Sequence, residues 1–90
     1  MYYYVNGKLA FCDTSVAVID CGGVGYKCYI SHNTYKTIHK LEKVKLYTYL
    51  NVKEDIFDLY GFADEQEKLF FTLLISVSGV GPVSYTHLIL

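Results

Sequence analysis

The chain has 90 residues, which is enough for one domain, or for one domain and part of a second. Its net charge of −1 provides no basic field for a polyanion, and no apolar run approaches the ~20 residues needed to span a bilayer. The first residues lack the charged start and long apolar stretch of a signal peptide, so we expect a cytoplasmic protein with no membrane partner. The three cysteines (Cys12, Cys21 and Cys28) form no C-x-x-C motif and are expected to be free thiols.

The first sixty residues predict a β-rich domain. Strand-like patterns cover residues 2–11, 15–21, 24–30, 44–52 and 56–62. In the fourth of these, the alternation places Val44, Leu46, Thr48, Leu50 and Val52 on one face. Asn6-Gly7 marks a bulge or bend in the first strand, and Gly22-Gly23 predicts a two-residue hairpin turn.

A short helix or turn is expected over residues 31–41, with Asn33 and Thr34 as candidate caps. Five strands with a short helix between the third and fourth follow the order of an OB-fold, a small Greek-key barrel that often binds oligonucleotides. A five-stranded sheet of another topology would give the same pattern. The Gly22-Gly23-Val24-Gly25 run lacks the G-K-[ST] ending and the G-x-G-x-x-G spacing of nucleotide loops, so it is interpreted as a hairpin.

A helix is predicted after residue 63, opened by Asp64 as N-cap and by Glu67 three residues later as a capping box. Its apolar stripe consists of Leu69, Phe70, Leu73, Leu74 and Val77, and Phe71 and Ile75 widen it. This apolar surface exceeds what a lone helix should expose. We therefore expect the helix to pack on something that the 90 residues only partly supply, in a second domain within which the chain stops.

The next segment, Ser78-Gly79-Val80-Gly81-Pro82, has two alternative interpretations. A tight Gly-x-Gly turn between two helices points amide N–H groups outward beside a helix N-terminus, and such a helix-hairpin-helix unit binds a phosphate. The alternative is an ordinary helix–helix turn capped by glycine, which these residues alone favour.

Four segments in this order and spacing, residues 18–26, 52–55, 59–62 and 74–82, resemble the N-terminal part of the RuvA family. Members of this family are the Holliday-junction-binding subunits of bacterial branch-migration complexes. The resemblance implies an OB-fold barrel domain at residues 1–63, mainly β, followed at residues 64–90 by the first helix-hairpin-helix of a truncated second domain.

The resemblance also implies partners and site residues. Four copies would form a plate that holds a four-way DNA junction for a RuvB-type hexameric ATPase, with a RuvC-type resolvase as a further partner. ATP and Mg²⁺ would be used by that motor, so no cofactor is expected here. Residues 78–82 would bind the DNA backbone, Glu54 and Asp55 would be acidic pins at the centre of the plate, and Lys53 is a candidate DNA contact.

The two carboxylates have a physical rationale beside the resemblance. Fourfold symmetry would place eight negative charges around one axis, where they would repel phosphates and favour separated strands. Without the resemblance, Glu54-Asp55 would be interpreted as a solvated turn.

This chain departs from the family pattern near its end. Val83 stands where the pattern has a lysine, which removes one phosphate-neutralising charge from the hairpin site. Residues 84–88 do not resemble the alanine- and leucine-rich helix that normally follows, so the tail from about residue 83 is atypical and is hypothesised to be of non-native origin.

No motif indicates an enzyme or a metal site. His32, His39 and His87 have no metal-ligand spacing to the cysteines and are expected at the surface, and no G-x-S-x-G motif places a nucleophile. We therefore expect a non-catalytic subunit that binds four-way junctions by structure rather than sequence, in recombination, DNA repair and the SOS response. The rival hypothesis is a small β-barrel protein–protein module without a DNA role.

Overall fold

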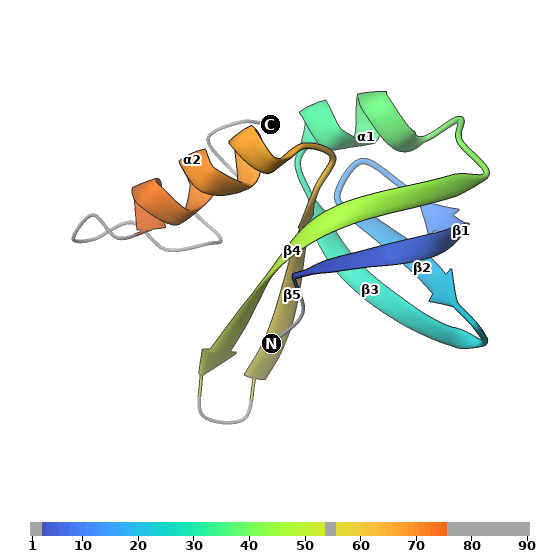
Figure 1. The fold of residues 1–90 in the computed structure, drawn as a ribbon, viewed down its shortest axis with the longest axis horizontal. Helices are drawn as coiled ribbons and strands as arrows, with labels where there is room; N and C mark the ends of the chain where they lie inside the picture. The colour runs from blue at the N-terminus through green and yellow to red at the C-terminus, as the bar shows by residue number, and fades with distance from the viewer. Residues whose placement is uncertain (1–2, 54–55, 76–90) are drawn as a thin grey trace.

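The computed structural model describes residues 3–53 and 56–75. These residues form five strands and two helices (Figure 1). The strands are β1 (Tyr4–Cys12), β2 (Val16–Cys21), β3 (Val24–Ile30), β4 (Lys43–Lys53) and β5 (Ile56–Phe62), and the helices are α1 (His32–Ile38) and α2 (Glu65–Ile75).

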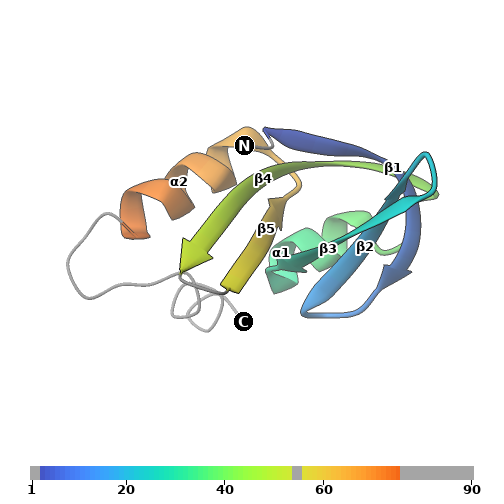
Figure 2. The same ribbon diagram turned by 90° about the horizontal axis from the view of Figure 1, so that it is seen from below.

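The strands close into a barrel in the order β1-β2-β3-β5-β4. All neighbours are antiparallel except β3 and β5, which run parallel at Tyr29↔Tyr60 and Ile30↔Gly61. The helix α1 connects β3 to β4 at one end of the barrel, and α2 leaves the barrel after β5 (Figures 1 and 2). The predicted five-stranded OB-fold barrel is therefore confirmed. Of the predicted helix-hairpin-helix, only α2 lies within the described residues, and the division at residue 63 stays a prediction.

The barrel interior is filled by apolar side chains from all five strands and from α1. The buried members are Val5, Ala17, Ile19, Cys28, Ile30, Ile38, Val44, Leu46 and Leu59. The alternation predicted for β4 holds at Val44, Leu46 and Thr48, which are at most 3% exposed, but not at Val52, which is 53% exposed. β4 is longer than the barrel wall, so its last residues leave the core.

The β2–β3 hairpin turns at Gly22-Gly23, as the sequence predicts. Both glycines have positive φ angles, 64° and 96°, a backbone conformation that is strained for any residue with a Cβ atom. Asp20 Oδ1 accepts a hydrogen bond from the Gly23 N–H at 2.8 Å. Positive φ at both central residues matches the right-handed twist of the flanking strands, so the turn fixes their register.

The strand β1 is shared between two neighbours. It pairs with β4 along its first half and with β2 from Lys8 onward. The bulge lies between Leu9 and Phe11, where the register against β2 shifts, and pairing through Asn6-Gly7 is continuous. The predicted irregularity is therefore in β1, but two to four residues later than expected.

The N-cap of α1 is Ser31, whose Oγ accepts a hydrogen bond from the Thr34 N–H at 3.1 Å. The expectation that Asn33 and Thr34 are the caps is wrong, because the N-cap is Ser31, two residues before Asn33, and the helix begins at His32. The side chains of Asn33 and Thr34 instead reach toward α2.

The predicted cap of α2 is confirmed for Asp64, because Asp64 Oδ1 accepts a hydrogen bond from the Glu67 N–H at 2.8 Å. Its buried face differs from the expected stripe. Phe71 is fully buried against the barrel, with Leu74 and Ile75 packed beside it, whereas Leu69, Phe70 and Leu73 are exposed. The docked side of α2 thus combines Phe71 and Ile75, which were expected only to widen the stripe, with Leu74 from the stripe itself, and Val77 lies outside the described residues.

Candidate nucleic-acid interface

The β4–β5 hairpin extends past the barrel as a two-stranded ribbon (Figure 1). Within the described chain, β1 pairs with β4 only as far as Tyr47, and β3 pairs with β5 only at Tyr60 and Gly61. The outer pairs of the ribbon are Asn51↔Asp58, Val52↔Phe57 and Lys53↔Ile56. The ribbon projects because these pairs lie beyond the strands that close the barrel.

An apolar cross-strand pair lies exposed near the end of this ribbon. Phe57 is 69% exposed and its partner Val52 is 53% exposed. Apolar side chains directly opposite each other on neighbouring strands stabilise the pairing of a ribbon. This pair also gives the ribbon an apolar surface next in the sequence to the charged residues Lys53, Glu54 and Asp55.

The predicted acidic pins belong to the connection of this ribbon. Lys53 ends β4 and pairs with Ile56, the first residue of β5. Glu54 and Asp55 stand between them in the sequence and lie outside the described residues, so their pin role stays a prediction. For Lys53 the structure gives the backbone pairing, and the DNA contact predicted for its side chain likewise stays a prediction.

The second predicted site, Ser78, Gly79, Val80, Gly81 and Pro82, also lies outside the described residues. It follows α2, whose last residue is Ile75. One predicted site therefore connects the two strands of the β4–β5 ribbon, and the other follows α2. The ribbon is formed by two barrel strands, and α2 contacts the same two strands (Figure 2).

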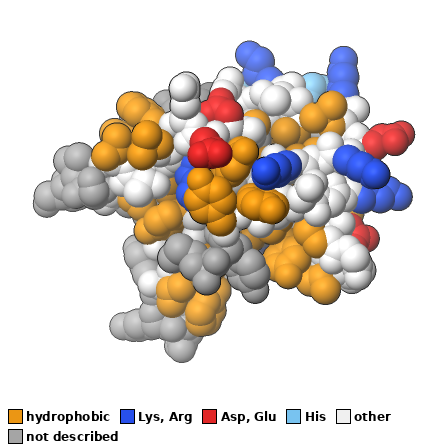
Figure 3. Space-filling view, in the orientation of Figure 1, with side chains coloured by type: hydrophobic (Ala, Val, Ile, Leu, Met, Phe, Trp, Pro, Cys, Tyr) orange, Lys and Arg blue, Asp and Glu red, His pale blue; other side chains and the backbone are white. Residues whose placement is uncertain are grey.

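Lysines and tyrosines alternate on the outer surface of β1, β4 and α2. Lys45 Nζ lies 4.3 Å from the ring centroid of Tyr4 and 5.2 Å from that of Tyr47, and Lys68 Nζ lies 4.1 Å from that of Tyr3. At these distances a cation is attracted by the face of the ring. In Figure 3, blue side chains accordingly lie beside orange ones in the middle of the surface.

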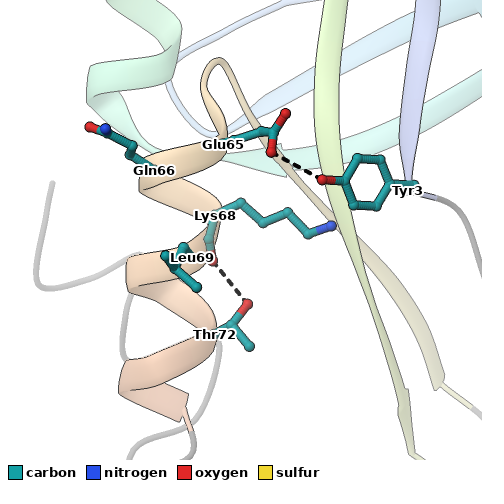
Figure 4. Close-up of a pocket in the computed structure, with 6 residues that line it drawn as sticks. All are labelled: Tyr3, Glu65, Gln66, Lys68, Leu69 and Thr72. Carbon is teal, nitrogen blue, oxygen red and sulfur yellow. Dashed lines mark hydrogen bonds between the residues drawn. The ribbon is translucent and has the colours of Figure 1, made fainter.

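A shallow groove of about 390 Å³ lies between Tyr3 and the first turns of α2 (Figure 4). Tyr3 Oη donates a hydrogen bond to Glu65 Oε2 at 3.1 Å, and this bond to the carboxylate raises the pKa of Tyr3. Thr72 Oγ1 donates to the Lys68 carbonyl oxygen at 2.9 Å. The Tyr3–Glu65 bond joins the residue before β1 to α2, whereas the Thr72 bond lies within α2 itself.

The residues 3–53 and 56–75 contain no group of three His, Cys, Asp or Glu side chains that could share a metal ion. His32 and His39 are exposed as predicted, and their rings stack on the two sides of Tyr35, at 6.0 and 4.7 Å between centroids. His87 lies outside the described residues.

Neither described helix is long and apolar enough to cross a membrane.

The contacts made by the Glu67 side chain could not be predicted from the sequence. Its carboxylate bonds to polar groups at the start of α1, more than thirty residues away in the chain. A capping-box pattern predicts a local partner for this glutamate, and no local pattern points to a second helix.

A closed five-stranded barrel with a short helix between β3 and β4 defines the OB-fold class. Comparison with known proteins places the chain more narrowly. Its residues 1–61 match the family of RuvA N-terminal domains, and the chain belongs to this family.

Several relatives share high identity with the chain, and each is named Holliday junction branch migration complex subunit RuvA. The relative from Bacteroides thetaiotaomicron is 54% identical over 81 residues, and the one from Bacteroides fragilis is 51% identical over 81 residues. Both alignments cover 90% of this chain and 40% of the relative. The relative from Prosthecochloris aestuarii is 46% identical over 83 residues, covering 91% of this chain and 42% of the relative. The chain thus spans about 40% of the length of the curated relatives that it matches.

Proposed function

We propose that the chain is the N-terminal part of a subunit that binds four-way DNA junctions by their structure and without reading their sequence. In this proposal it is non-catalytic and positions a RuvB-type hexameric ATPase for branch migration in recombination and DNA repair. The observation that carries the proposal is the 54% identity to a branch-migration complex subunit over 90% of the chain. ATP and Mg²⁺ would act in the motor, and the protein would work in the cytoplasm as a homotetramer.

The projecting ribbon supports the part of the proposal that concerns the junction centre. Its outer pairs extend beyond the barrel wall, so the carboxylates of Glu54 and Asp55 would be carried away from the body of the domain. Four copies would bring eight such carboxylates around one axis. Each like-charge pair at a few ångströms costs about 1 kcal/mol in water and more where water is thin. Phosphates near that axis would be repelled, which favours separated strands over a stacked crossover.

The segment 78–82 would supply the grip on DNA. Its amides, followed by a helix that starts at Pro82, would hold a phosphate oxygen without contacting a base. Val83 supplies no charge at this site, so we expect a weaker phosphate contact than a lysine there would give. The acidic ribbon and the hairpin thus have opposite roles, one repelling strands at the centre and the other holding them further out.

A second candidate function rests on the exposed apolar side chains. Leu69, Phe70 and Leu73 on α2 are 55–60% exposed, and surfaces of this kind often bind other proteins. A β-barrel that only binds proteins would account for this surface without any DNA contact.

A gel-shift experiment separates the two candidates. Residues 1–81 of this chain are joined to the remaining sequence of the Bacteroides thetaiotaomicron relative, and a four-way junction is compared with a linear duplex of the same arm sequence. The proposal predicts a retarded complex with the junction at concentrations that leave the duplex free. Equal retardation of both DNAs, or of neither, would leave the protein-binding module as the better account.

A further inference from the structure

The Glu67 carboxylate joins α2 to the start of α1. Ser31 Oγ and Thr34 Oγ1 donate hydrogen bonds to Glu67 Oε1 at 3.1 and 2.8 Å, and Asn33 Nδ2 donates to Glu67 Oε2 at 3.0 Å. Three side chains from one helix N-terminus thus converge on a single carboxylate from the other helix. Hydrogen bonds to an ionised acceptor are shorter and stronger than those between neutral groups.

The two hydroxyl groups in this network are buried and use both of their hydrogen-bonding capacities. Ser31 is 2% exposed and Thr34 is 0% exposed. Ser31 Oγ accepts from the Thr34 N–H, and Thr34 Oγ1 accepts from the Ala63 N–H at 3.4 Å, while both donate to Glu67. Removing the carboxylate would leave the buried Thr34 hydroxyl without an acceptor and the Ser31 hydroxyl with only Thr34 Oγ1, at 3.3 Å. An unsatisfied buried donor costs more than the loss of an exposed hydrogen bond.

A second anchor lies one helical turn further along α2. Phe71 is fully buried, with ring centroids 4.9 Å from Phe62, 5.3 Å from Tyr49 and 5.5 Å from Tyr60. Apolar contact is not directional, so a helix held only by Phe71, Leu74 and Ile75 can still change its angle on the barrel. Hydrogen bonds depend on both distance and angle, and a second, directional anchor on a different element removes this freedom.

We infer that Glu67 is a positioning residue, which fixes the direction in which α2 leaves the barrel by bonding to Ser31, Asn33 and Thr34. Phe71 is the fully buried apolar side chain of α2, with Leu74 and Ile75 packed beside it, and Glu67 sets the angle. The segment 78–82 follows α2 by a few residues, so this angle governs where a strand held by that segment would lie relative to the β4–β5 ribbon. This last consequence, and only this one, rests on the proposed function.

The test measures the orientation of α2 directly, with backbone residual dipolar couplings of the 90-residue chain in a dilute aligning medium. In the unsubstituted chain, one alignment tensor should fit the amides of both the barrel and α2. In Glu67→Ala, the barrel amides should keep their tensor while the α2 amides depart from it by more than experimental error. Glu67→Gln keeps an acceptor for the two hydroxyls and should restore most of the agreement.

Two further variants make the test specific. Thr34→Val removes the donor at 2.8 Å with little change in shape, and its effect should not add to that of Glu67→Ala because both break one network. Gln66→Ala shortens the exposed side chain next to Glu67 in the same helix turn and should leave the α2 couplings unchanged. The inference is overturned if one tensor still fits the barrel and α2 of Glu67→Ala, or if Gln66→Ala has the same effect.

The functional consequence is measured in the chimera with the Bacteroides thetaiotaomicron sequence. Glu67→Ala should weaken binding of a four-way junction by roughly tenfold, equivalent to about 1.4 kcal/mol, with Glu67→Gln in between. If the unsubstituted chimera does not bind the junction, the proposed function fails while the coupling measurement still decides the role of Glu67. If α2 is reoriented and junction affinity is unchanged, the consequence for DNA is wrong.

Discussion

Gly7 lies where β1 passes from pairing with β4 to pairing with β2. A Cβ at this position would overlap the carbonyl oxygen of Asp20, although the φ angle of Gly7 is not in the left-handed region. The backbone of β2 cannot move aside without breaking the barrel wall. The need for glycine here comes from the close approach of two strands and not from backbone conformation.

We therefore expect Gly7→Ala to lower the free energy of unfolding by about 2 kcal/mol or more, as overpacking against backbone does. Urea unfolding followed by circular dichroism measures this loss. Gly25→Ala is the matched control, because its Cβ would meet only the Val18 side chain, at 3.3 Å. We expect it to change stability by less than about 1 kcal/mol. Equal losses in the two variants would contradict the close-approach explanation.

Cys28 is fully buried in the barrel core, and this burial raises the pKa of its thiol from 9.0 to about 12, with a smaller contribution from Cys21. Below pH 9 the thiol is protonated in both the folded and the unfolded chain. Between pH 9 and about 12 the unfolded chain releases a proton that the folded chain keeps. This difference stabilises the unfolded chain, so the contribution of Cys28 to stability is lost as pH rises.

The free energy of unfolding should accordingly fall more steeply with pH above 9 in the unsubstituted chain than in Cys28→Ala. The limiting difference in slope is about 1.4 kcal/mol per pH unit. Urea titrations of both proteins between pH 8 and 10.5 measure it, and other titrating groups cancel in the comparison. Parallel pH dependences would show that Cys28 ionises as readily in the folded chain as in the unfolded one.

At the scale of the element, α2 shows which of two apolar faces a helix uses. Phe71 is fully buried and its neighbour Phe70 is 55% exposed, so two adjacent residues of one type have different environments. The cluster of Phe71 with Tyr60 and Phe62 is separate from the main barrel core. Substitutions in this cluster should loosen α2 before they unfold the barrel.

Phe71→Ala should cost about 3–5 kcal/mol of the interaction that docks α2, the usual range for a buried phenylalanine. The expected result is a loss of helical circular dichroism while the barrel strands stay protected in hydrogen exchange. Phe70→Ala, the control on the exposed side, should cost about 1 kcal/mol or less. A larger loss from Phe70→Ala would mean that α2 docks by its other face.

Local sequence patterns were sufficient to predict each element but not its partner. The glycine pair at residues 22–23, the alternation in β4 and the Asp64 cap are signals that lie within a few residues of one another. The structure has the glycine turn and the cap, and it has the alternation from Val44 to Thr48 but not at Val52. The buried face of α2 could not be predicted in this way, because apolar residues occur on both sides of the helix. Its choice depends on the aromatic side chains of β4 and β5, which only the fold brings together.

The same limit applies to the candidate sites. The partners of Glu67 lie 33–36 residues away, so spacing along the chain gave no sign of them. The sequence was sufficient to place Glu54 and Asp55 between two predicted strands. The projection of the ribbon beyond the barrel could not be predicted, because it depends on where β1 stops pairing with β4 and β3 stops pairing with β5. The roles of these two residues, and of residues 78–82, stay predictions.

At the scale of the whole molecule, the proposed acidic pins can be tested through their charge. Glu54→Gln with Asp55→Asn, in the chimera described above, should tighten junction binding several-fold, because each like-charge contact removed is worth about 1 kcal/mol in water. It should also reduce strand separation at the crossover, measured by the fluorescence of 2-aminopurine placed there. Glu42→Gln removes one carboxylate from an exposed loop position and is the control for the single variant Glu54→Gln. Unchanged binding and unchanged fluorescence in the double variant would remove the pin role.

In the proposed function, the protein recognises the shape of a junction and not its sequence. The most direct measurement compares, at one salt concentration, the affinities of the chimera for two four-way junctions of unrelated sequence and for linear duplexes with the same arms. We predict equal affinities for the two junctions, each at least about tenfold, or about 1.4 kcal/mol, tighter than for its duplex. A duplex bound as tightly as its junction, or two junctions bound with clearly different affinities, would contradict the account.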